Sequence, residues 1–293
     1  MKNERVKIAY LVIAYMDPEQ LKRLAVRLTG TSDVYVHINS SVDIAPFQAA
    51  LADVQGEGHV CFARERYRIV WAGFSILQAT FSMMEQALSQ DSYDRIVLLT
   101  GLDYPIKPDA QIQSFFREHA RTEFVHAHLV TGETHEELCY QDCRDSRFLH
   151  RMFGYMNGVL KVLGKKGKAD YVMHEGKKYS IYGISPKWAL SGECAAYLLD
   201  FYKKNRKFNQ YFQMMHAPDD YYVATVLYNS QYRERIESEK DIFKILWLPE
   251  DKGAKVLESE DLEELSSCGQ LYAKKFLSGH SEELEKMLDE RAE

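Results

Sequence analysis

Short, continuous apolar runs recur through the first 130 residues, and a polar or helix-like stretch follows each of them. Such runs are typical of strands that are buried on both faces of a parallel sheet. They predict strands over Ile8–Ile13, Asp33–Ile38, His59–Ala63, Arg95–Thr100 and Glu123–His128. Strands that alternate with helices indicate an α/β fold, in which helices flank a central, mostly parallel sheet.

Apolar residues at helical spacing occupy the segments between and after these strands. A helix is expected to open at Pro18, and an amphipathic helix at Ser75, where Gln78 is placed for a capping box. Further helices are expected over Gly192–Tyr202 and from Pro218. The pattern therefore continues as strand and helix through most of the chain.

Two regions depart from this pattern. The segment from about 130 to 178 is polar and irregular, and the tail from about 258 to 293 is charged and predicted helical. The basic run Gly164–Lys168 is interpreted as a solvated loop, which is the usual role of such a run. The chain has 293 residues, of which 46% are hydrophobic, and this suits a single domain over 1–293.

Charge and cysteine usage exclude several classes of protein. The formal net charge of −6 argues against nucleic acid as a partner, because phosphate-backbone binders are usually basic. No run approaches the about 20 apolar residues of a membrane helix, and the N-terminal run is interpreted as a strand rather than a signal peptide. Five cysteines without a CxxC motif favour reduced thiols, so a cytoplasmic location is expected.

Four segments, taken in order, carry a family resemblance. They are AYLVIAYMDPEQLKRL near the start, VWAGFSILQA at 70–79, LLTGLDYPIK at 98–107 and APDDYYVATVLYNS at 217–230. Together they resemble the core-2/I-branching β-1,6-N-acetylglucosaminyltransferase family, which includes xylosyltransferase-like members. GLDYPIK is the most specific match, and the segments Trp188–Asp200 and Leu271–Phe276 support it. Without the cysteine pattern or anchor of animal members, the chain looks like a bacterial member.

The resemblance implies a fold, a reaction and a set of substrates. It implies a GT-A type nucleotide-sugar-binding fold and an inverting transfer from a UDP-sugar, with GlcNAc or a related sugar, to an acceptor hydroxyl. It implies no cofactor and no metal. The acceptor is expected to be a carbohydrate or glycoconjugate, and a lipid-linked acceptor would bring peripheral membrane association.

The resemblance places the catalytic base in the segment Ala217–Asp220. This segment matches the family motif S-P-D-E, so Asp220 stands where the family has its glutamate base, and Asp219 is an acceptor-side candidate. A carboxylate suits the role, because it needs only to reach the acceptor hydroxyl and accept its proton. The alternative is that both acids complement the first turn of a helix that Pro218 opens.

Lysine side chains are expected to stabilise the negative charge of the departing diphosphate. After the strand Arg95–Thr100 there is one acid, Asp103, where metal-dependent GT-A enzymes have two, and one acid is a poor cation site. Asp103 is kept as a donor-side candidate. Lys275 matches the family's diphosphate lysine, and Lys255 matches a basic position that is usually arginine. The alternative is that the lysines of LYAKKF lie on a solvated helix face.

Five further candidates follow from position or from loose matches. Ala14 and Asn39 end the first two strands, where a parallel sheet presents its ligand crevice. Asn39 replaces the aspartate that is common in the family, so an amide stands where the family has a carboxylate. Trp71 is a donor-side candidate or a core residue. Glu123 and Trp247 match acceptor-side positions loosely, and Trp247 is otherwise a buried aromatic.

Two other functions stay open at this point. One is a metal-dependent GT-A transferase that uses Asp103 together with an acid from elsewhere. The other is a catalytically inactive module that binds carbohydrate or nucleotide, because an aspartate replaces the motif's glutamate. Turnover in the presence of a chelator separates the first from metal-independent transfer, and donor hydrolysis separates the second.

Overall fold

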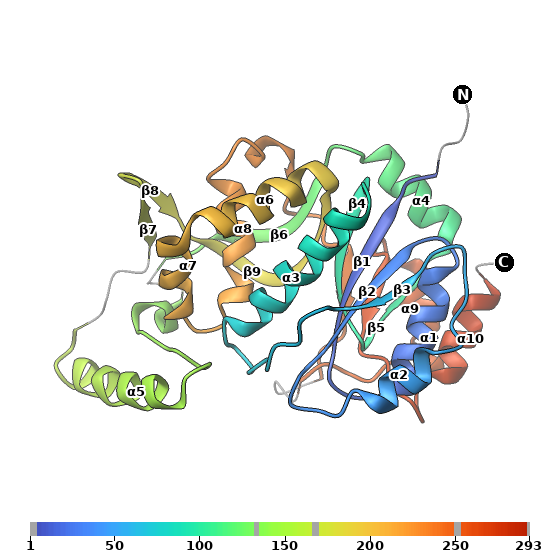
Figure 1. The fold of residues 1–293 in the computed structure, drawn as a ribbon, viewed down its shortest axis with the longest axis horizontal. Coiled ribbons are helices and arrows are strands. Elements are labelled where there is room, and N and C mark those ends of the chain that lie inside the picture. Colours follow the sequence, from blue (N-terminus) through green and yellow to red (C-terminus); the bar gives the residue numbers. More distant parts are fainter. Residues whose placement is uncertain (1–4, 132–134, 166–169, 249–252, 292–293) are drawn as a thin grey trace.

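The computed structural model describes residues 5–131, 135–165, 170–248 and 253–291. Within these residues, seven strands form a central sheet with helices on both faces (Figure 1). From edge to edge, the strands are β10 (Ile236–Glu237), β6 (Glu123–Leu129), β9 (Tyr182–Ser191), β4 (Arg95–Thr100), β1 (Ile8–Ala14), β2 (Asp33–Ile38) and β3 (Val60–Phe62). Neighbours run parallel except at β9, which is antiparallel to β4 and β6. The expected α/β fold is confirmed.

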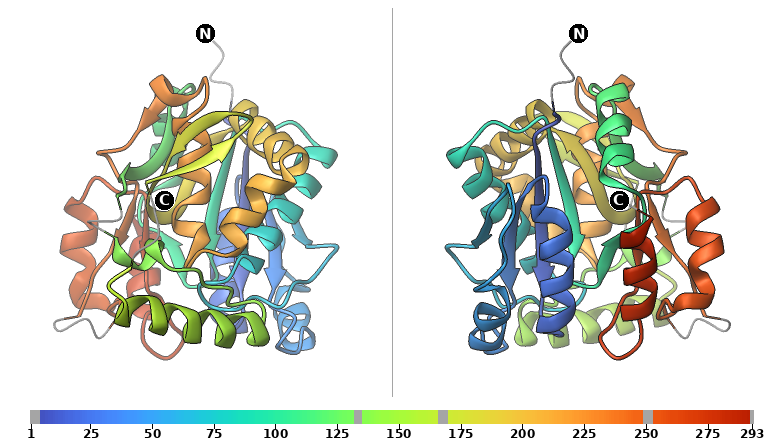
Figure 2. Two further views of the ribbon diagram at one scale, coloured as in Figure 1. Left: turned by 90° about the vertical axis from the view of Figure 1, so that its left-hand side faces the viewer. Right: turned by 90° about the vertical axis from the view of Figure 1, so that its right-hand side faces the viewer.

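Two hydrophobic cores lie on opposite faces of this sheet, because successive side chains of a strand point to opposite sides. In β1, Ala9 and Leu11 join one core, whereas Tyr10 and Val12 join the other. The first core is covered by α3 (Ser75–Gln90), α6 (Gly192–Lys204), α7 (Arg206–Gln213) and α8 (Tyr222–Tyr228). The second core is covered by α1 (Pro18–Thr29), α2 (Ala45–Leu51), α4 (Asp109–Glu118), α9 (Leu262–Ser267) and α10 (Glu282–Glu290) (Figure 2).

The sequence predicted a helical C-terminal tail, but the tail also contains a strand. A small second sheet consists of β11 (Phe243–Ile245), β12 (Tyr272–Lys274) and β5 (Asp103–Pro105), in that order. β12 lies between α9 and α10 in the chain and pairs antiparallel with β5. The lysines of LYAKKF therefore belong to a strand and its end, because pairing with β5 outweighs the local helical pattern.

The polar segment from about 130 to 178 holds more regular structure than its sequence indicated. It contains the 3-10 helix η1 (Glu136–Cys139), the long helix α5 (Arg147–Val162) and β7 (Tyr171–His174), which forms a hairpin with β8 (Lys177–Ser180). In Figure 1, α5 stands apart from the sheet. Lys166 to Lys168 of the basic run lie outside the described residues. Among the described helices, none is long and apolar enough to cross a membrane.

Helix α3 begins at Ser75 as predicted, but the capping box with Gln78 does not form. The position before the helix is Phe74, which provides no side-chain cap. The Ser75 hydroxyl instead donates to Asp145 Oδ1 at 2.6 Å, and Asp145 Oδ2 accepts from the Ser75 amide at 3.1 Å. An acid 70 residues away thus caps this helix, which a local motif cannot reveal.

Candidate active site

The carboxyl ends of β1, β2 and β4 meet at one edge of the sheet. The Asn39 amide donates to the Ala14 carbonyl at 2.9 Å, and the Gly101 amide donates to the Ile13 carbonyl at 2.9 Å. A Cβ atom on Gly101 would lie 2.9 Å from that of Ala14, so the glycine permits this close approach. Ligands of open α/β sheets bind at this edge. The structure thus brings Ala14 and Asn39 together where the sequence placed them.

The Asn39 side chain holds the loop that precedes Trp71. Its Oδ1 accepts from the Ile69 amide at 3.2 Å and from the Ser41 amide and hydroxyl at 3.0 Å each. Its Nδ2 donates to the Ile69 carbonyl at 2.9 Å. Both ends of the amide are engaged within the protein, so the side chain positions the loop at the carboxyl edge.

Trp71 is exposed, which excludes its interpretation as a core residue. Its side chain is 76% exposed, and its ring lies 5.6 Å from the His216 ring and 5.6 Å from the Arg144 guanidinium. The next residue, Ala72, accepts a hydrogen bond from the Ala217 amide at 3.1 Å. Ala72 and Ala217 both have left-handed φ angles, of 58° and 47°. Non-glycine residues rarely adopt them, and they cluster at functional sites.

Asp219 and Asp220 follow Ala217 in the 3-10 helix η2 (Pro218–Asp220). Pro218 opens only this short turn, and α8 follows as a separate helix. Neither η2 nor α8 has a side-chain cap at its first position. A Cβ atom on Gly183 would lie 2.5 Å from the Asp220 carbonyl, so η2 rests on the start of β9. Because β9 is antiparallel to β4, its start lies at the carboxyl edge, the same edge that holds Ala14 and Asn39.

The two carboxylates have pKa values well above those of ordinary aspartates. Burial raises the pKa of Asp220 to about 7, and the negative charge of Asp219 adds to the effect. Burial also raises the pKa of Asp219 to about 6, although its own backbone amide and His216 oppose the shift. Neighbouring acids of this kind titrate as a coupled pair. A carboxylate with a pKa near neutrality can accept a proton from a hydroxyl as that hydroxyl attacks.

A polar cluster that sequence reasoning missed lies beside η2. Asp142 contacts His216 Nδ1 at 3.0 Å, Arg144 Nε at 2.7 Å and His150 Nδ1 at 2.7 Å. Burial works to raise the pKa of Asp142, but hydrogen bonds from His150, Arg144 and His216 outweigh it and lower the pKa. The cluster lines a cavity of about 280 Å³ together with Tyr140, Gln141, Gly154, Asn157 and Lys161. The one signal in the sequence was a histidine directly before Ala217.

The two candidate diphosphate lysines lie side by side. The Phe276 amide donates to the Leu102 carbonyl at 3.0 Å, which places Lys275 next to the segment that follows β4. The Lys275 amide donates to the Lys255 carbonyl at 3.3 Å. The Lys255 ammonium pairs with Asp261 at 2.6 Å. Within the part of the chain that the structure describes, Lys275 has no ion-pair partner.

Asp103 is a structural residue, and its expected contact with the donor is wrong. Its side chain is fully buried. Oδ2 accepts from the Thr100 amide at 2.5 Å and the Thr100 hydroxyl at 2.8 Å, and Oδ1 forms an ion pair with Lys187. The acid folds back onto the end of β4, and its charge is neutralised inside the protein.

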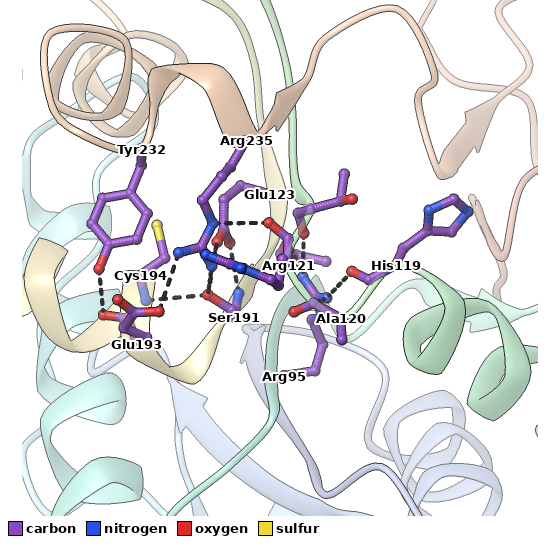
Figure 3. Close-up of polar contacts among 12 residues, drawn as sticks. Arg95, His119, Ala120, Arg121, Glu123, Ser191, Glu193, Cys194, Tyr232 and Arg235 are labelled. Atoms are coloured by element: carbon purple, nitrogen blue, oxygen red, sulfur yellow. Dashed lines mark hydrogen bonds and ion pairs between the residues drawn. The ribbon is translucent and has the colours of Figure 1, made fainter.

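Glu123 lies at the opposite edge of the sheet, so its expected contact with the acceptor is also wrong. It is the first residue of β6 and is fully buried. Its carboxylate accepts from the Ser191 amide, the Ser191 hydroxyl and the Arg235 guanidinium, each at 2.7 Å (Figure 3). Because β9 is antiparallel to both β4 and β6, β6 runs in the same direction as β4 and begins at the edge opposite to the carboxyl ends. Glu123 therefore cannot reach the edge that holds Asp220.

Trp247 is 68% exposed, which excludes its interpretation as a buried aromatic. It forms an isolated bridge with Ala254, and the Lys255 amide donates to the Leu246 carbonyl at 2.7 Å. Because Ala254 directly precedes Lys255, the backbone of Trp247 lies next to that of this lysine. The contact of Trp247 with an acceptor stays a prediction.

Comparisons with known proteins give one partial relative and several distant structural likenesses. A xylosyltransferase (oxt) of Drosophila pseudoobscura pseudoobscura is 28% identical over 128 residues, which cover 43% of this chain and 14% of that protein. Staphylococcus aureus TarS 1–349, solved in complex with UDP-GlcNAc, is 15% identical, with 88% of this chain and 64% of that chain covered and a TM-score of 0.39. The glycosyltransferase GlyE of Streptococcus pneumoniae is 9% identical, with coverages of 99% and 60% and a TM-score of 0.36.

The family comparison covers far more of the chain. The profile of the Core-2/I-Branching enzyme family matches residues 8–265. The matched region runs from β1 through η2 to α9, so it contains the carboxyl edge with Ala14, Asn39 and Asp220. The chain belongs to the Core-2/I-Branching enzyme family, as its four ordered segments predicted, and its expected class is that of the glycosyltransferases.

Proposed function

We propose that this chain is an inverting glycosyltransferase that moves a sugar from a UDP-sugar to a hydroxyl group of a carbohydrate or glycoconjugate. One observation carries the proposal. Asp220 lies at the carboxyl edge beside a second acid, and burial raises its pKa to about 7. UDP-GlcNAc is the first donor to test, and UDP-xylose is the second because the partial relative is a xylosyltransferase.

The reaction is a single displacement. The acceptor oxygen attacks the anomeric carbon as Asp220 takes the proton of the hydroxyl. The bond from that carbon to the diphosphate oxygen breaks, and UDP leaves with the electron pair on the opposite face, so the anomeric configuration inverts. A positioned base contributes about 10²–10⁴-fold to such a step. Asp219 keeps a negative charge near Asp220 and thereby maintains the basicity of its carboxylate.

Lysine rather than a metal stabilises the departing UDP in this proposal. Lys275 is placed beside the segment after β4 with its charge unpaired among the described residues, and such a preorganised charge is worth about 2.7–4 kcal/mol. Lys255 would have to break its ion pair with Asp261 before it could contact the diphosphate. The one acid that could begin a metal site after β4, Asp103, is paired with Lys187 and hydrogen-bonded to Thr100.

A donor-turnover assay tests the proposal and its alternatives together. The protein is incubated with UDP-GlcNAc or UDP-xylose, with and without EDTA and Mn²⁺, and UDP release is measured. We expect release that survives EDTA. Activity that EDTA abolishes and Mn²⁺ restores would favour a metal-dependent transferase. A thermal shift with UDP but no release from either donor, with or without simple sugar acceptors, would favour a binding module.

A further inference from the structure

Helix α5 exposes a continuous apolar stripe on its outer side. Phe148, Met152, Tyr155, Val159 and Val162 follow each other at intervals of four and three residues, which is the spacing of one helix face. All five are exposed, with Phe148 at 74% and Tyr155 at 78%, and Met156 and Leu163 widen the stripe. The fold does not require these apolar side chains, because they contribute nothing to either core.

The opposite side of α5 attaches the helix to the rest of the protein. Phe153 is the only residue of this helix that is buried, and Leu149 and Leu160 are half-buried on the same side. Asn157 donates to the Gln141 carbonyl at 2.7 Å. The exposed stripe is therefore fixed in an outward orientation, and its exposure does not result from a detached helix.

Basic residues accompany the stripe, and acids are absent. The segment from Arg147 to Lys165 contains four Lys or Arg residues and no Asp or Glu, in a chain whose formal net charge is −6. Arg147 and Arg151 are exposed beside the apolar stripe, and with Phe148 and Met152 they line a cavity of about 520 Å³. An apolar face bordered by cations fits a surface that is apolar beneath and anionic on top.

We propose that α5 binds the surface of an anionic lipid bilayer, lying in the plane of the membrane with its apolar stripe among the acyl chains. Amphipathic helices that combine aromatic and aliphatic residues with Lys or Arg bind membranes in this way. Arg147 and Arg151 then contact the lipid phosphates. At 16 residues, α5 lies on the membrane and does not cross it.

Docking of α5 brings the candidate active site to the membrane. His150 of α5 contacts Asp142, which contacts His216, and His216 directly precedes the turn that holds Asp219 and Asp220. In Figure 2, α5 lies along the lower side of the molecule, away from the N-terminal end. The membrane surface would thus lie near an acceptor bound at the turn. The docking itself does not depend on the proposed transfer, because lipid binding is measured without substrates.

The charge of α5 favours lipid over a second copy of this chain. Two copies that met through this face would bring cationic segments together, and neither segment has an acid to compensate the other. Each basic residue near an anionic bilayer instead contributes about fivefold to binding. Self-association therefore serves as an outcome of the test.

Co-sedimentation with vesicles tests the proposal. One set of vesicles contains equal amounts of phosphatidylcholine and phosphatidylglycerol, and the other contains phosphatidylcholine alone. We expect the protein to sediment with the first set and far less with the second. The variant Phe148→Gln/Met152→Gln/Tyr155→Gln should lose binding by on the order of 100-fold, because the apolar contact is removed. Arg147→Gln/Arg151→Gln should lose it by on the order of 10-fold or more.

Matched variants elsewhere on the surface are the controls. Val26→Gln/Leu129→Gln removes two exposed apolar side chains, and Arg206→Gln/Lys207→Gln removes two exposed charges. Both should bind as the original protein does, and all variants should keep their melting temperature. Absence of sedimentation with anionic vesicles, or unchanged binding by the triple variant, would overturn the proposal. So would a dimer in sedimentation velocity that the triple variant converts to monomer without any vesicle binding.

Discussion

Glu123 and Asp220 are both acids at an edge of the same sheet, but the groups that surround their carboxylates differ. Glu123, at the amino edge, accepts three hydrogen bonds, one of them from the guanidinium of Arg235. Asp220 lies at the carboxyl edge, where burial raises its pKa to about 7 and the negative charge of Asp219 adds to the effect. The partners of each carboxylate, and not burial alone, therefore distinguish these two acids.

The difference has an energetic meaning. A buried charge is tolerated when it is paired and hydrogen-bonded, and otherwise its pKa shifts toward the neutral form. The turn that carries Asp220 also contains the left-handed Ala217, held by Ala72, which is left-handed as well. Unpaired acids and unfavourable φ angles cost free energy that the two cores must offset. Their coincidence at one turn supports the proposal that this turn carries the catalytic base.

The largest expected effect comes from Asp220→Asn, which keeps the size of the side chain but cannot accept a proton. We expect transfer to fall by about 10²–10⁴-fold, with UDP affinity unchanged, in a steady-state assay of the purified variant. Asp219→Asn is the control and should cost less. If Asp219→Asn were the inactive variant and Asp220→Asn remained active, the base would be Asp219 and not Asp220.

Lys275→Ala is expected to have the next largest effect. Loss of a preorganised charge at the leaving group should lower kcat by on the order of 10²-fold. Lys274→Ala removes the neighbouring charge in β12 and should change kcat little. Equal and small effects of the two substitutions would indicate that both lysines serve only as surface charge.

Glu123→Gln tests the other half of the comparison. The substitution removes one of the two acids that pair with Arg235, whose contact with the exposed Glu193 remains. We expect a loss of about 2–3 kcal/mol in the free energy of unfolding, since Arg235 is partly exposed. Thermal unfolding should show a decrease of about 5 °C. Turnover per folded molecule should stay unchanged. A large loss of turnover at unchanged stability would contradict this structural role and indicate that Glu123 acts in the active site.

The smallest expected effect concerns stability as a function of pH. The folded pKa of Asp220 is raised from 3.8 to about 7, so the folded state binds more protons than the unfolded state between these values. Stability should therefore decrease as pH rises from about 4 to 7 through this group. Asp220→Asn should remove part of that decrease and be more stable at pH 8 by about 1 kcal/mol. Lower stability of the variant at pH 8 would instead indicate a capping role.

Local sequence patterns were sufficient for the strands that build the sheet. The predicted bounds of β2 and β4 coincide with those observed. A short apolar run between polar flanks is buried completely when it forms a strand inside the sheet, so its ends mark the ends of the strand. Helix α5 was missed for the converse reason. Its apolar residues face outward and it lies within the polar segment from about 130 to 178, so the sequence analysis interpreted it as irregular. Strand β12 was missed because its partner, β5, lies far away in the chain.

The sequence by itself determined the family, the fold class and the position of the acidic turn, because these depend on ordered motifs and local periodicity. Only the tertiary structure decided which acids are paired with a cation. Asp103 meets Lys187 across 84 positions, and Glu123 meets Arg235 across 112. Asp220 meets no such cation among the described residues, and its pKa is raised. Partners that distant are set by how the sheet assembles, and no local pattern of residues encodes them.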